Sequence, residues 1–166
     1  MTEATLRPLA ASDRAAVERI IGAVAVFSPE EIEIALELVD EWLESGEESG
    51  YLTYVIEETA GTGKGTLRGF VCFGPTPLTE GTYDLYWVAV DPAAQGHGYG
   101  QRLLAFAEAE VCRRAGRLLL IETASHEAYA ATVRFYERAG YQLVSRIPHF
   151  YRAGDDKLTF AKFITE

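Results

Sequence analysis

Apolar and polar positions along the chain follow two different spacings. Residues 51–57 and 67–73 carry β-branched and aromatic side chains in the alternating pattern of strands. Helical spacing instead places Ile32, Leu36 and Val39 on one face of residues 28–45. Over the whole chain these patterns predict strands at 5–9, 51–57, 67–73, 83–90, 117–123, 141–147 and 158–164, and helices at 12–26, 28–45, 98–115 and 125–139.

Local signals mark several of these elements. Ser28, Pro29 and Glu31 supply a cap, a proline at the first helical position and an acid three residues after the cap. Ser12 is expected to cap the first helix. The continuous apolar run at 118–121 is typical of a strand buried on both faces.

The sequence contains no repeat, linker or low-complexity tract. Strands and helices that intermingle in this way over 166 residues predict one α/β (α+β) domain spanning residues 1–166. The glycine-rich segment 61–66 superficially resembles a phosphate-binding P-loop. It fails that pattern because Lys64 is followed by Gly65 and position 58 is Glu58, so we expect a hairpin there.

Composition narrows the partners and the compartment. A formal net charge of −10 argues against nucleic acid, whose phosphates are held by Lys and Arg. No apolar run approaches the roughly 20 residues that span a bilayer, and the N-terminus lacks the layout of a signal peptide. Cys72 and Cys112 fall within a strand-like and a helical pattern, as buried thiols of a reducing compartment do. We therefore expect a cytoplasmic protein with no membrane partner, no disulfide and no zinc site.

Acidic residues are concentrated between Glu30 and Glu48, where no Lys or Arg occurs. Such a run is usually a solvated helix face. It is also compatible with a field that attracts a cationic amine. The sequence leaves both interpretations open.

One stretch combines an apolar strand, a glycine-rich loop and a helix. The strand ends at Asp91-Pro92, and glycines follow at 96, 98 and 100 before the helical pattern begins. The first N–H groups of a helix lack internal partners, and glycines let a backbone approach a phosphate closely. The dinucleotide fingerprint would require glycine at position 101, which is Gln101, and would follow the first strand of the fold. The stretch predicts an anion site of another kind.

The loop resembles the acyl-CoA loop of the GNAT superfamily of N-acetyltransferases. That motif, Gln or Arg, two residues, Gly, one residue, then Gly or Ala, is met by Gln95, Gly98 and Gly100. A second family motif is matched by the helix that ends in Phe135-Tyr136-Glu137-Arg138-Ala139-Gly140-Tyr141. The resemblance covers nearly the whole chain. It implies a mixed central sheet of about seven strands with about four helices, splayed at the acyl-CoA site.

The resemblance also implies a cofactor, acetyl-CoA, and the residues that hold it. Backbone N–H groups of the loop (Gln95, Gly96, His97, Gly98, Tyr99 and Gly100) would face the pyrophosphate. His97 is either a donor to a phosphate or a plain exposed histidine. The strand backbone at Val88, Ala89 and Val90 would pair with the pantetheine amides. Tyr129 occupies the position of a CoA-contacting Asn, and Thr132 that of an Ala.

Acetyl transfer requires a neutral amine, a stabilised oxyanion and a proton for the departing thiolate. In the family the proton often comes from a tyrosine at the position of Tyr136, which is otherwise a core aromatic. Asp84 is a candidate base, and we expect Asp84, Tyr86 and Val88 to alternate onto one face of their strand. Glu122 is the second candidate, His126 and His149 are weaker ones, and a water chain is an alternative. The His126-Glu127 pair is not a zinc motif.

The leading hypothesis is an acetyl-CoA-dependent N-acetyltransferase for a primary amine of a small molecule or an amino-acid-like substrate. One alternative is acetylation of protein or peptide N-termini or lysines, with the acidic helix and residues 75–81 forming a peptide groove. Another is a non-catalytic module that binds acyl-CoA. A homodimer is a further expectation from the resemblance.

Overall fold

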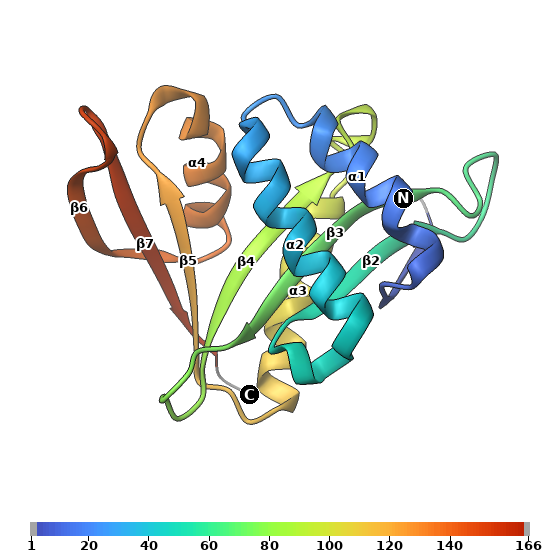
Figure 1. Cartoon of the computed structure of the whole chain (residues 1–166), viewed down its shortest axis with the longest axis horizontal. Helices are drawn as coiled ribbons and strands as arrows, with labels where there is room; N and C mark the ends of the chain where they lie inside the picture. Colours follow the sequence, from blue (N-terminus) through green and yellow to red (C-terminus); the bar gives the residue numbers. More distant parts are fainter. Residues whose placement is uncertain (1–2, 165–166) are drawn as a thin grey trace.

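The computed structural model describes residues 3–164 and contains one seven-stranded sheet. The strands lie side by side in the order β1-β2-β3-β4-β5-β7-β6 (Figure 1). The β4–β5 pair is parallel and the other neighbours are antiparallel, so the sheet is mixed as expected. The strands are β1 (Ala4–Pro8), β2 (Leu52–Glu58), β3 (Leu67–Pro75), β4 (Thr82–Val90), β5 (Leu118–Ala124), β6 (Gln142–Arg152) and β7 (Asp155–Phe163).

Four α-helices cover the two faces of this sheet. Figure 1 shows α1 (Arg14–Ala23) and α2 (Pro29–Ser45) crossing in front of the strands, with α3 (Tyr99–Arg113) behind them. The core beneath α1 and α2 joins Val17, Val39 and Phe70. The core on the opposite face joins α3 to α4 (Ala130–Arg138) through Leu103 and Tyr136. We call these the α2 face and the α4 face.

The side chains of β4 switch between the two faces of the sheet partway along the strand. Its register with β3 passes from Leu85↔Phe73 to Trp87↔Cys72, so Tyr86 is an extra residue, a β-bulge. Before the bulge Leu85 packs into the α4-face core, and after it Val88 and Val90 do so. The expectation that Asp84, Tyr86 and Val88 share one face is therefore wrong, because the bulge moves Val88 to the α4 face.

The parallel pairing between β4 and β5 is short. It runs from Thr82↔Leu118 to Leu85↔Ile121 and includes no residue of β4 beyond Leu85. The second half of β4, from Tyr86 to Val90, thus stays beside β3 but separates from β5. This is the splay that the resemblance implies.

Several predicted boundaries shift for identifiable reasons. Ser12 lies in a single 3-10 turn, and α1 is capped at Asp13, which Arg7 of β1 holds through a 2.6 Å contact. The first helix stops at Ala23 rather than Val26, because Val24 is already extended. The fourth helix begins at Ala130 rather than 125, because the N–H groups of Ser125 and His126 donate to the Asp155 carboxylate instead.

The C-terminal strands are longer than predicted. Residues 148–152 belong to β6 and residues 155–157 to β7, where the sequence predicted a loop. The apolar run at 118–121 is buried on one face only, since Leu119 and Ile121 are buried whereas Leu118 and Leu120 are half-buried. The α2 capping box and the hairpin between β2 and β3 are as predicted. Among residues 3–164, no helix is long and apolar enough to cross a membrane.

Candidate active site

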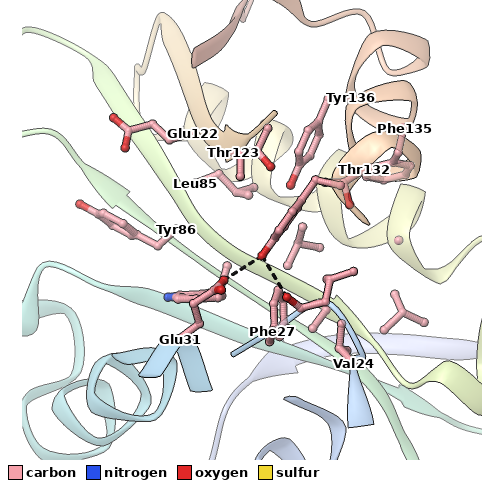
Figure 2. Close-up of a pocket in the computed structure, with 18 of the residues that line it drawn as sticks. Val24, Phe27, Glu31, Leu85, Tyr86, Glu122, Thr123, Thr132, Phe135 and Tyr136 are labelled. Atoms are coloured by element: carbon pink, nitrogen blue, oxygen red, sulfur yellow. Dashed lines mark hydrogen bonds between the residues drawn. The ribbon is translucent and has the colours of Figure 1, made fainter. Parts of the chain in front are cut away.

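A cavity of about 1320 Å³ passes through the splay between β4 and β5. Its lining comes from both faces of the sheet: Phe27 and Glu31 from the α2 side, and Phe135 and Tyr136 from α4. Figure 2 shows these groups around one space, with Glu122 and Tyr86 together on one side of the view. The splay therefore opens a passage between the two layers of helices.

The glycine loop borders one end of this cavity. Gly96 and Gly98 have φ values of 83° and 81°, the left-handed region, and a Cβ on either would meet open space. Glycine is thus required there by backbone conformation rather than by close packing. Gly98 precedes α3, whose first N–H groups have no intrahelical partner. Gly100 packs against Phe135, where an added Cβ would lie 3.5 Å from the ring.

Two side chains of the loop are turned away from the cavity. The His97 ring contacts the carbonyls of Ala94 and Gln95, each at 3.1 Å, and His97 does not line the cavity. The Tyr99 side chain is buried and its hydroxyl donates to Glu58 over 2.9 Å. Only the backbone of Tyr99 is available to a ligand in the loop. His97 helps shape the loop instead of facing an anion.

The strand residues Val88, Ala89 and Val90 also line the cavity. Their backbone pairs with β3 through Val71, Phe70 and Gly69. On the other side the splay leaves no strand partner for them among the described residues. This edge can accept an extended ligand such as a pantetheine arm.

Tyr136 lies on the α4 face with its hydroxyl at the cavity. The residue as a whole is 5% exposed, but its hydroxyl oxygen is not among the fully buried unpaired atoms: it points into the cavity in Figure 2 and makes no hydrogen bond to a described residue. Burial raises the pKa of the Tyr136 phenol, so the group stays protonated well beyond neutral pH. A protonated hydroxyl that faces the cavity without a hydrogen-bond partner is suited to donate a proton to a ligand.

The two candidate bases lie on the α2 face. Asp84 is half-buried, and its carboxylate accepts a 2.7 Å hydrogen bond from the Thr76 hydroxyl. Glu122 is exposed and lies 3.2 Å from the Lys157 ammonium. Asp84 pairs in register with Leu120, two residues before Glu122, so both carboxylates project from the same face of the sheet. The acid and the bases thus approach the splay from opposite faces.

The two weaker histidine candidates differ in position. His126 lines the cavity, lies 3.9 Å from Asp155 and packs edge-on against Tyr129. His149 lies away from the cavity in the β6–β7 arm, where its Nδ1 accepts from the Gly154 N–H over 2.8 Å. His149 is therefore unable to reach a substrate in this cavity.

Tyr129 has a partner that the sequence did not indicate. Its hydroxyl donates to the Glu31 carboxylate over 2.8 Å, with the Val26 carbonyl at 3.4 Å (dashed in Figure 2). Burial, and then the negative charge of Glu31, raise the pKa of Tyr129. The contact joins the segment before α4 to the start of α2 across the cavity. Tyr129 consequently bridges the cavity walls, and its hydroxyl is directed at α2.

Other lining residues were missed by sequence reasoning. Tyr86 is exposed by the bulge, Tyr51 packs edge-on against it at 5.3 Å, and Tyr151 reaches the cavity from β6. No periodicity signals a bulge, and residue 151 was assigned to a loop. Among the described residues, no group of three His, Cys, Asp or Glu could hold a metal ion.

Comparisons with known proteins agree on one family. The family model of the acetyltransferase (GNAT) domain matches residues 49–143. A solved GNAT-family acetyltransferase structure from Desulfovibrio desulfuricans is 42% identical over 98% of this chain and 99% of that chain, with a TM-score of 0.91. Among curated proteins, no match is found.

More distant structures share the fold. A ribosomal-protein-alanine N-acetyltransferase from Escherichia coli has a TM-score of 0.74, and a Salmonella typhimurium acetyltransferase solved with acetyl-CoA has 0.73. Each is 23% identical and covers 98% of this chain and 95% of its own. Together with the domain match and the 42% identity, the splayed sheet and its glycine loop lead to one assignment: the chain belongs to the GNAT family of acetyltransferases, enzymes that take the acetyl group from acetyl-CoA.

Proposed function

We propose that residues 1–166 act as one domain that transfers the acetyl group of acetyl-CoA to the primary amine of a small molecule. The observation that carries this proposal is the cavity through the β4–β5 splay, with the glycine loop on one side and two carboxylates on the other. Such a passage lets two substrates meet from opposite directions. It supports direct attack in a ternary complex.

The cofactor half of the cavity fits a pyrophosphate and an extended arm. The N–H groups from Gly96 to Gly100 and the N-terminus of α3 supply donors and a partial positive charge. No Lys or Arg lies in this loop, so the backbone carries the anion binding. The free edge of β4 at Val88, Ala89 and Val90 aligns the arm, which directs the thioester to the splay.

The chemistry then divides between the two faces. Asp84, or Glu122 through water, takes a proton from the ammonium on the α2 face, which frees the amine to attack the thioester carbonyl. The new C–N bond forms as the C–S bond breaks, and the attacking nitrogen then releases its second proton to solvent to give the neutral amide. The Tyr136 phenol gives its proton to the departing thiolate on the α4 face and recovers one from solvent. His126, which packs against Tyr129 and lines the cavity, is a weaker candidate for the base.

The test is thiol release from acetyl-CoA over a panel of amines, with mass spectrometry of the products. We expect amine-dependent release and an acetylated amine, together with a rise in melting temperature when acetyl-CoA is added. Amine-independent binding without turnover would instead describe a module that only binds acyl-CoA. A protein that acetyl-CoA fails to stabilise would contradict the loop assignment itself.

A homodimer in the cytoplasm is the remaining part of the proposal. β6 is an edge strand, all its residues are exposed, and Leu143, Val144 and Ile147 are apolar. Exposed apolar edge strands favour pairing with another strand, here that of a second copy. Light scattering should give twice the mass of the chain, and Val144→Glu should reduce the measured mass to that of a single chain. A monomer at every concentration would contradict the dimer.

A further inference from the structure

The α2 side of the cavity forms a pocket of its own, distinct in character from the cofactor half. Its walls are Glu31, Tyr51, Asp84, Tyr86, Glu122 and Tyr151, which we call the acceptor pocket. Burial, and then the negative charges of Asp84 and Glu122, raise the pKa of Tyr86. Burial, and then the negative charges of Glu122 and Glu31, raise the pKa of Tyr151. They therefore belong to one contiguous surface.

Negative charge dominates this surface. Five acidic residues line the whole cavity, against a single arginine, Arg152. Arg152 lies 3.7 Å from Asp155, and Lys157 lies 3.2 Å from Glu122, so these two acids have cationic partners. The carboxylates of Glu31 and Asp84 have none among the described residues, and neither does that of Glu30, which is exposed. Carboxylates without a cationic partner in one pocket favour a ligand that brings positive charge.

Glu31 is held ready for such a cation. One of its oxygens accepts the Ser28 N–H at 3.4 Å in the capping box, and the other accepts the Tyr129 hydroxyl at 2.8 Å. Both donors are neutral, so they orient the carboxylate without cancelling its charge. Each oxygen keeps capacity for a further donor.

Aromatic rings complete the pocket. Tyr51 and Tyr86 meet edge to face at 5.3 Å, and Trp87 and Tyr151 also line the cavity. Rings of this kind bind an apolar body and attract a cation to their faces. The Tyr136 residue is 5% exposed, and its hydroxyl, which makes no hydrogen bond to a described residue, opens into the same cavity, where a ligand can meet it.

We propose that the acceptor is a small cationic amine that bears an aromatic or apolar group and no carboxylate, and that Glu31 is the residue that selects it. The inference rests on the proposed function and narrows it. An amino acid would bring its own carboxylate among Glu31, Asp84 and Glu122, with only the already paired Arg152 to receive it. Juxtaposed like charges are strongly unfavourable, so such acceptors are rejected.

The first experiment compares matched acceptors on the unmodified protein. Tyramine against tyrosine, and phenethylamine against phenylalanine, differ only by the carboxylate. We expect kcat/KM for each amine to exceed that of its amino acid by about 10- to 100-fold. A tetrapeptide with a free N-terminus is the third arm and should be the poorer acceptor.

The second experiment tests Glu31 itself. Glu31→Gln keeps a capping-box side chain, so α2 should still form. We expect it to raise the KM for tyramine about tenfold, to change kcat less than about threefold, and to shrink the tyramine preference by about tenfold. Glu33→Gln removes the same charge from an exposed position of α2 that does not line the cavity, and it should leave all three values unchanged.

The outcomes separate the two proposals. Equal use of tyramine and tyrosine, or a clear preference for the tetrapeptide, overturns the small cationic acceptor but leaves N-acetyl transfer intact. Identical behaviour of Glu31→Gln and Glu33→Gln removes Glu31 from selection. Failure to acetylate any amine sinks the proposed function and this inference with it.

Discussion

Replacing Tyr136 by Phe removes one hydroxyl and leaves the ring in place. The ring packs 6.1 Å from Tyr141 and 6.2 Å from Phe160, contacts that a phenylalanine retains. The hydroxyl makes no hydrogen bond to a described residue, so its removal leaves no partner unpaired. The free energy of unfolding should therefore change by less than about 0.5 kcal/mol.

Catalysis should respond very differently from stability. A positioned general acid contributes about 10²- to 10⁴-fold, so kcat should fall at least about 100-fold, or ~2.7 kcal/mol in activation free energy. The KM for acetyl-CoA should stay within about twofold, because the hydroxyl acts on the leaving thiolate rather than on cofactor binding. Release of CoA thiol, followed at saturating amine, measures both quantities.

Tyr141→Phe is the matched control. Tyr141 is buried beside Tyr136 but does not line the cavity, and its hydroxyl donates to the Glu108 carboxylate over 2.9 Å. Its loss should lower the free energy of unfolding by about 1–2 kcal/mol and leave kcat within about twofold. Tyr136→Phe with wild-type kcat, or an equal loss of activity in both variants, would refute the acid assignment.

Three further predictions concern the loop, the base and the fold. Gly98→Ala and Gly61→Ala both place a Cβ on a residue with φ near 80° (81° and 77°), so each variant should lose about 1 kcal/mol of stability. Only Gly98→Ala should also raise the KM for acetyl-CoA, by about tenfold, as measured by thiol release. Asp84→Asn should lower kcat/KM more than Glu122→Gln, because the Glu122 carboxylate is already paired with Lys157 whereas Asp84 has no cationic partner among the described residues; a larger loss in Glu122→Gln would favour Glu122 as the base. Hydrogen bonds from Arg7 and from the Ala10 N–H lower the pKa of Asp13 in the folded protein. The stability that Asp13 contributes is therefore present above the pKa that it has in the unfolded chain, and it is lost as pH falls through its lower pKa in the folded protein. Urea unfolding at pH 7 should show Asp13→Asn destabilised by about 1–3 kcal/mol, and this difference should shrink progressively as pH falls below about 4; a difference independent of pH would contradict the ion pair as its source.

Local sequence signals predicted the elements that local interactions determine. The start of α2 was predicted to the residue, because Ser28 and Glu31 bond each other's backbone within one turn. The glycine loop was found because its spacing reflects backbone conformations that only glycine adopts readily.

Features built from distant parts of the chain were not predictable in this way. The β6–β7 arm was read as a loop because its order depends on groups whose partners are remote. Asp155 accepts the Ser125 and His126 N–H groups, and the Asp156 N–H donates to the Ser125 hydroxyl. The Tyr129–Glu31 contact joins residues 98 positions apart, so the sequence did not indicate which acid of the run faces the cavity. The spacing of apolar and polar residues in β4 did not predict the bulge at Tyr86.

The bulge and the splay together explain how one strand can serve both substrates. Without the extra residue, strict alternation would carry Asp84, Tyr86 and Val88 to a single face. With it, Asp84 and Tyr86 remain on the α2 face while Val88 and Val90 turn to the α4 face, and the pairing with β5 ends at Leu85, directly beside the switch. A thioester aligned along β4 would therefore lie in the gap itself. In the mechanism that we propose, an amine reaches its carbonyl from the acidic side while Tyr136 meets the sulfur from the other, so neither substrate must leave for the other to bind.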